Sequence, residues 1–145
     1  MTRHDDLPKA EFAFPGPVRD KLVAAILSGA KTSTTTLEVE FEAFGEALPV
    51  VGERQVVVDS QDRPVAVIEV TEVRKLTVAE IDLQHVIDEG EGDGTIAQWR
   101  ASHERFWHSP QMREALGDPG FTVTDATPVV ADRFRVVEIL DPAAA

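Results

Sequence analysis

Residues 55–59 (QVVVD) and 65–73 (VAVIEVTEV) decide the fold class of this chain, and the turn sequence SQDRP at 60–64 separates them. Both runs are rich in β-branched residues, which favour extended backbone, and a short turn between two such runs predicts an antiparallel hairpin. Alternation along the second run places Glu69 on its less apolar face. The two runs therefore predict a β-hairpin near the middle of the chain.

Helices are predicted on both sides of this hairpin. Residues 17–28 begin with a proline and are followed by Gly29, which is typical of a helix and its left-handed stop. The capping boxes at 77–80 (TVAE) and 95–98 (TIAQ) predict helices that run to about 89 and 108. A further short helix is expected from 110 to Gly117.

Residues 31–37 are expected to be a loop that turns into an extended segment, and further extended stretches are expected at 121–124 and 129–140. Strands mixed with helices, some of them paired as hairpins, favour an α+β fold over a parallel doubly wound sheet. We predict an antiparallel or mixed β-barrel with flanking helices.

The length and composition indicate one domain spanning residues 1–145. Its core is expected at about 14–140, with frayed ends at 1–9 and 141–145. The chain has no cysteine, no signal-like apolar start and no apolar run long enough for a membrane span, so we expect a cytoplasmic protein without membrane contact. Its net charge of −12 opposes binding to duplex DNA, and nothing in the sequence indicates an oligomeric state.

Two segments resemble metal sites, and neither satisfies the spacing that a metal requires. His103 and His108 lie at i and i+5, whereas the zinc-protease signature places its histidines at i and i+4 on one helix face. The acidic segment 88–94 (DEGEGDG) has Arg100 where a calcium loop needs its last carboxylate. We therefore expect no metal site and no stable cofactor, and the alternative interpretation of segment 88–94 is a weakly held magnesium ion or a contact to a ligand amine.

The segment 29–34 (GAKTST) is the most suggestive local feature. Lys31 lies among hydroxyl-bearing residues directly after a helix end, where it could serve as a cation for an oxyanion or a phosphate. A solvated, threonine-rich edge strand is the alternative interpretation of the same residues.

Four motifs in order give the chain a resemblance to the ASCH-domain family over about residues 14–138. They are Gly29-x-Lys31-x-x-Thr34, Ile68-Glu69-Val70-Thr71, the acidic glycine-rich segment 88–93, and a helix carrying Trp99, His103 and Trp107. The resemblance implies a PUA-like β-barrel with a link to RNA. It also implies a cleft in which Lys31, Thr34 and Glu69 face a base or nucleoside.

In small relatives the equivalents of these three residues hydrolyse the amide of N4-acetylcytidine, and other members are associated with RNA cleavage or RNA binding. Thr36 stands where many relatives have arginine. The residues expected to contact the ligand are Thr32, Ser33, Glu91, Asp93, Trp99 and His103.

Three functions follow from this resemblance. In an amidase, Thr34 attacks the acyl carbon, and Lys31 is either the base or a fixed cation, in which case Glu69 is the base. In a ribonuclease, Lys31 stabilises the phosphorane and His103 adds acid–base capacity. In a binding module without catalysis, aromatic side chains stack an RNA base or a nucleotide.

Overall fold

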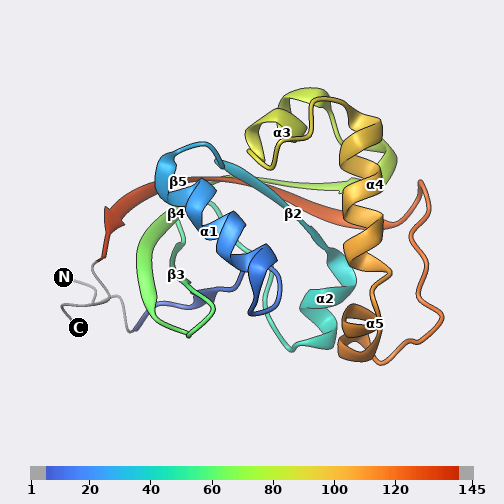
Figure 1. Cartoon of the computed structure of the whole chain (residues 1–145), viewed down its shortest axis with the longest axis horizontal. Coiled ribbons are helices and arrows are strands. Elements are labelled where there is room, and N and C mark those ends of the chain that lie inside the picture. The colour runs from blue at the N-terminus through green and yellow to red at the C-terminus, as the bar shows by residue number, and fades with distance from the viewer. Residues whose placement is uncertain (1–5, 141–145) are drawn as a thin grey trace.

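The computed structural model describes residues 6–140 (Figure 1). Frayed ends were predicted at 1–9 and 141–145, of which residues 1–5 and 141–145 lie outside the described residues. The expected start of the core at about 14 is too late, because Lys9–Ala10 forms strand β1 and Phe12 is buried. Ala10 and Phe12 both belong to the same apolar cluster as Phe134.

Five strands form one mixed sheet in the order β1-β3-β4-β5-β2. Strand β1 pairs in parallel with β3 (Arg54–Val58), and the other neighbours are antiparallel: β3 with β4 (Pro64–Thr77), β4 with β5 (Pro128–Ile139), and β5 with β2 (Ser33–Leu37). The predicted hairpin is β3–β4. Residues 121–124, expected to be extended, are a loop.

The expected barrel does not form, and the correct description is an open, five-stranded mixed sheet. Strands β1 and β2 are its two edges, and within residues 6–140 no ladder joins them. The physical reason is the length of β1, since a two-residue strand offers too few backbone groups to close a sheet.

The helices are α1 (Pro17–Ser28), α2 (Glu38–Ala43), α3 (Leu83–Asp88), α4 (Ile96–Trp107) and α5 (Pro110–Leu116), with a 3₁₀ turn at Val78–Glu80. The single helix expected from 77 to 89 is interrupted, because Ile81 is extended and Asp82 caps a new helix. Helix α2 was not predicted. Within the described residues, no helix has the length and apolarity to cross a bilayer.

The long strands β4 and β5 cross the whole molecule, with α1 over one part of the sheet and α3, α4 and α5 gathered toward its other end (Figure 1). Alternating residues of β5 serve two apolar clusters. Val129 and Ala131 pack with the residues of α3, α4 and α5, while Phe134 packs with those of α1, β1 and β3. Helix α1 buries Val23 and Ile26, whereas Val18 is 53% exposed.

Candidate functional site

Lys31 is a buried cation at the junction between α1 and β2. The chain leaves α1 through Gly29, whose left-handed φ of 86° ends the helix, and turns into the sheet. The Lys31 Nζ donates to Ser33 O at 2.9 Å, Glu89 O at 3.3 Å and Glu91 Oε2 at 3.0 Å. The side chain is 1% exposed, so these three acceptors replace the water that an ammonium group needs.

Glu89 lies at the C-terminal end of α3 and is the most heavily bonded carboxylate of the site. It accepts hydrogen bonds from Thr35 Oγ1 at 2.6 Å, Trp99 Nε1 at 3.0 Å and His103 Nε2 at 3.0 Å. Burial alone would raise its pKa. The hydrogen bonds from His103 and His85 and the charge of Lys31 outweigh burial and hold the pKa of Glu89 well below its usual range. Glu89 is therefore a fixed anion.

His103, on α4, has a hydrogen-bond acceptor at each ring nitrogen. Its Nδ1 lies 2.9 Å from Trp99 O, and its Nε2 lies 3.0 Å from Glu89 Oε1. Both partners only accept, so the arrangement requires a proton on each nitrogen, which makes the ring an imidazolium. Burial would lower the pKa of His103, but the hydrogen bond and charge of Glu89 raise it.

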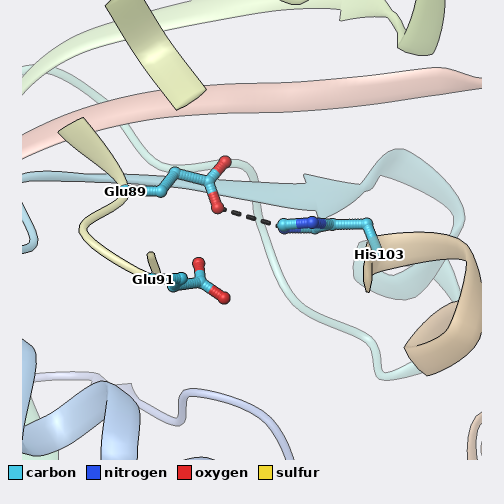
Figure 2. A group of neighbouring side chains, drawn as sticks. All are labelled: Glu89, Glu91 and His103. Atoms are coloured by element: carbon cyan, nitrogen blue, oxygen red, sulfur yellow. Dashed lines mark hydrogen bonds and ion pairs between the residues drawn. The ribbon is translucent and has the colours of Figure 1, made fainter. Parts of the chain in front are cut away.

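Glu89, Glu91 and His103 bring three metal-ligating side chains together, with one ligand atom of each within 4.8 Å of the others (Figure 2). Two features of the cluster oppose a metal ion. The ammonium of Lys31 already neutralises Glu91, and the protons of His103 point at acceptors. The residues therefore fit a network of two anions and two cations better than a metal centre.

Strand β2 presents its hydroxyl groups to two different surroundings. Ser33 and Thr35 face α3, where Ser33 Oγ donates to His85 O at 3.0 Å and Thr35 Oγ1 lies 2.8 Å from His85 Nε2. Because side chains alternate along a strand, Thr34 points to the opposite face. Among the hydrogen bonds of residues 6–140, none involves the Thr34 hydroxyl.

Thr34 lines a hollow of about 880 Å³ that opens between α1, β2, α2, the loop after α3, and α4. Its polar and charged lining includes Lys31, Thr36, Glu40, Glu89, Glu91, His103 and Asp132. Its aromatic lining comprises Phe12, Phe14, Phe41, Phe44, Phe106 and Trp107. A hollow of this size with apolar walls and a few converging polar groups is typical of a small-ligand site.

Asp132 is a second carboxyl group with a shifted pKa in this hollow. It is nine-tenths buried, and within the described part of the chain its Oδ1 has no hydrogen-bond partner. Burial raises the pKa of Asp132 to about 7, although the charge of Lys31 works against this rise. Glu89 and Asp132 thus lie in one site with pKa values displaced in opposite directions.

Four of the nine predicted site residues line the hollow: Lys31, Thr34, Glu91 and His103. Glu69 does not meet Lys31 as expected. It accepts hydrogen bonds from Arg54 Nε at 3.2 Å and Arg135 Nη2 at 3.0 Å, and these guanidinium groups lower its pKa. Glu69 is therefore engaged in an ion-pair cluster outside the hollow.

The other predicted residues are also engaged outside the hollow. Trp99 is 1% exposed and stacks on His103 with ring centroids 4.4 Å apart, so it offers no free face to a base. Asp93 accepts from Ser102 Oγ at 3.1 Å. Thr32 Oγ1 donates to Asp88 O at 3.4 Å, and Ser33 is fully buried.

Glu89 and Asp132 were not predicted as site residues, although each carries a recognisable signal in the sequence. His85 and Glu89 lie at i and i+4, which places them on one face of a short helix. Asp132 alternates with Val130 and Phe134 along the predicted strand, so a carboxyl group occupies a position between two apolar ones. A carboxyl group at such a position is buried, and a buried carboxyl without a partner indicates a functional site.

The protein is an α+β domain in which a buried ion network lies beside an apolar-walled hollow. The ASCH domain family model matches residues 11–138. The chain therefore belongs to the ASCH domain family, as its motifs indicated. No curated protein matches the chain.

Two solved structures have the same fold. The ASCH domain from Lactobacillus crispatus JV V101 is 27% identical, with a TM-score of 0.72 over 92% of this chain and 83% of that one. Protein EF3133 from Enterococcus faecalis V583 is 24% identical, with a TM-score of 0.74 over 91% of this chain and 77% of that one. The second likeness bears on the fold alone, because function lies in the site and not in the architecture.

Proposed function

We propose that this ASCH-domain protein is a hydrolase that acts on the amide of an acylated, cytidine-type nucleoside. The observation that carries the proposal is the presence of the Lys31 ammonium and the unused Thr34 hydroxyl in the lining of one hollow. The Gly29-x-Lys31-x-x-Thr34 motif, which contains both residues, also supports the proposal. Attack by an alcohol on an acyl carbon beside a fixed cation is a recognised arrangement for acyl transfer.

Lys31 is the oxyanion-stabilising cation in this proposal and not the base. Two carboxylates and two backbone carbonyls surround its Nζ, and all of them are acceptors that suit an ammonium group. Glu91 is the replaceable partner, because its side chain is 25% exposed and lies between two glycines of positive φ. A substrate carbonyl oxygen would take the place of Glu91 beside the ammonium.

The charge distribution favours a neutral nucleoside over a strand of RNA. The chain has a net charge of −12, which weakens its attraction for a polyanion. The deepest cations of the hollow are already engaged: Lys31 by carboxylates, and Arg19 by the carbonyls of Phe12 and Ala13 at 3.2 and 2.8 Å. Stacking positions for a base exist on Phe41 and Phe44, and Phe44 is 42% exposed.

The test is incubation with N4-acetylcytidine and measurement of cytidine by chromatography. We expect wild-type turnover, and a loss of about 10²-fold or more in Thr34→Val. Thr36→Val is the matched control, because Thr36 lies on the same strand face and lines the same hollow. It should retain the activity.

Each alternative function has its own outcome in this test. Release of short fragments from single-stranded RNA, with no cytidine formed from the nucleoside, would replace the amidase by a ribonuclease. Saturable binding of nucleoside without product would make the protein a binding module. Equal activity of the Thr34→Val and Thr36→Val variants would exclude Thr34 as the nucleophile.

A further inference from the structure

Asp132 is a buried carboxyl group that the ion network of Lys31, Glu89, Glu91 and His103 does not use. Its Oδ1 is inaccessible to solvent and, among residues 6–140, has no hydrogen-bond partner. An unsatisfied buried carboxyl oxygen costs free energy, and such groups are retained where they serve a ligand or a reaction. The position of Asp132 in the sheet indicates which group it serves.

Asp132 lies directly opposite Thr34 in the antiparallel ladder between β5 and β2. Directly opposed residues of an antiparallel pair project from the same face, with Cβ atoms about 4.5–5.5 Å apart. Both side chains line the hollow. At this separation, rotation about χ1 brings a threonine hydroxyl within hydrogen-bond distance of an aspartate oxygen.

We propose that Asp132 is the proton acceptor for the Thr34 hydroxyl, so that the two residues form a nucleophile–base pair across the β2–β5 ladder. The inference rests on the proposed acyl-transfer function, because a threonine hydroxyl that attacks an acyl carbon needs a base. The pair itself can be tested with a simple acyl donor that has no nucleoside part.

Three other acids of the hollow are already bound to protein donors, and its remaining acids, Glu11 and Glu46, are exposed. Glu89 accepts from three side chains and is a fixed anion. Glu91 is hydrogen-bonded to Lys31. Glu40 accepts from the Leu37 backbone N–H at 3.1 Å, as the capping residue of α2.

Burial raises the pKa of Asp132 to about 7, and the charges around the carboxyl group modify this rise. Lys31, at the start of β2, favours its ionised form, while Glu89 beyond α3 and Glu53 before β3 disfavour it. Glu40 faces the hollow from α2, and burial raises its pKa to about 7 as well. A base is most effective when its pKa lies near the working pH, and Asp132, with a pKa of about 7, meets this condition.

The reaction balances with no other reactant than water. Thr34 Oγ forms a bond to the acyl carbon, and its proton moves to the Asp132 carboxylate. The C–N bond then breaks, and Asp132 returns the proton to the leaving amine. Water attacks the resulting ester with Asp132 again accepting a proton, the Thr34 oxygen leaves with that proton, and the products are the amine and a carboxylic acid.

The experiment uses p-nitrophenyl acetate as the acyl donor and locates the acetyl group on the intact protein by peptide mass mapping. We expect acetylation of Thr34 at a rate that rises with pH through about 7. Asp132→Asn should slow this acetylation by about 10²–10⁴-fold. Thr122→Val, at an exposed threonine outside the hollow, should leave it unchanged. Glu40→Gln should leave the pH dependence in place.

Three results would overturn the pair: no acetyl group on Thr34 of the wild type, an Asp132→Asn rate equal to wild type, or a pH dependence that disappears in Glu40→Gln. If Asp132→Asn does not fold, as judged by circular dichroism, the wild-type pH dependence and its survival in Glu40→Gln decide the question. Acetylation of Thr34 without hydrolysis of N4-acetylcytidine would support the pair and contradict the proposed substrate.

Discussion

The Nζ of Lys31 lies 3.0 Å from Oε2 of Glu91 and 3.9 Å from Oε1 of Glu89, although 60 and 58 positions separate it from these residues in the chain. The loop after α3 therefore crosses directly over the start of β2. This crossing creates the ion network beside the hollow, and it makes the network a determinant of stability as well as of function. The predictions below test both roles.

Lys31→Met should destabilise the fold by about 3–5 kcal/mol, because it leaves the buried Glu89 and the partly exposed Glu91 without their cation. Urea denaturation followed by circular dichroism measures this loss. Lys75→Met is the control, since Lys75 pairs with Glu38 while its own side chain is 63% exposed. A change below about 1 kcal/mol is expected there. Equal losses in the two variants would contradict the buried-network description.

Gly90→Ala should be far more destabilising than Gly92→Ala, although both glycines have positive φ and share one loop. A Cβ on Gly90 would overlap the Ala30 carbonyl and lie 2.8 Å from the Lys31 backbone nitrogen, whereas a Cβ on Gly92 meets nothing within 4 Å. We expect about 3–5 kcal/mol for the first substitution and about 1–2 kcal/mol for the second. Thermal unfolding of both variants checks the difference.

The imidazolium of His103 should make stability depend on pH above the ordinary histidine value. Its pKa is raised from 6.5 in the folded protein, so its contribution is complete below 6.5 and is lost as pH rises through the raised value. The free energy of unfolding should fall over this window in the wild type, and less so in His103→Gln. Urea titrations across the window measure the fall, and NMR of the ring protons reports the pKa directly.

The opposite result for His103 would be a ring that titrates at or below 6.5. Such a ring would lack a proton on one nitrogen at neutral pH. Its contact with either Trp99 O or Glu89 Oε1 could then not be a hydrogen bond.

Glu89→Gln should cost about 3–5 kcal/mol of stability, because it removes the anion that compensates Lys31 and His103 in a buried site. The NH₂ group of the new amide would also face some of the side chains that now donate hydrogen bonds to Glu89, so two donors would meet. Glu69→Gln is the matched control, with the same change at the carboxylate between Arg54 and Arg135. Denaturation midpoints that fall equally would contradict the central role of Glu89.

Local chemistry made most of the fold predictable. Proline at the start and Gly29 after the end bounded α1 correctly, and Thr95 caps α4 through its bond to the Gln98 N–H at 3.1 Å. The β-branched runs became β3 and β4. Helix α2 was not predicted, because its six residues directly follow a strand and no typical N-cap residue precedes them. Its one N-terminal signal is Glu40, whose carboxylate accepts a hydrogen bond from the Leu37 N–H.

The site was only partly predictable, and the glutamates show why. Glu69 lies in a motif beside β-branched residues, and its sequence context gave no sign of the two arginines that hold it. Glu89 lies in an acidic segment typical of a solvated connector, yet it is 1% exposed. The difference arises from the packing of α3 against β2, which involves residues far apart in the chain.

The sequence by itself determined the features that depend on neighbouring residues: the hairpin, the ends of α1, α4 and α5, the family, and the spacing of Lys31 and Thr34 in one segment. Only the tertiary structure decided which acid meets Lys31, which face of β2 opens to the hollow, and which residue stands opposite Thr34. Short-range preferences of the backbone act over a few residues and can be recognised in a string of letters. Burial and charge pairing act through space, so their outcome depends on strand order and on the path of the loop through Gly90.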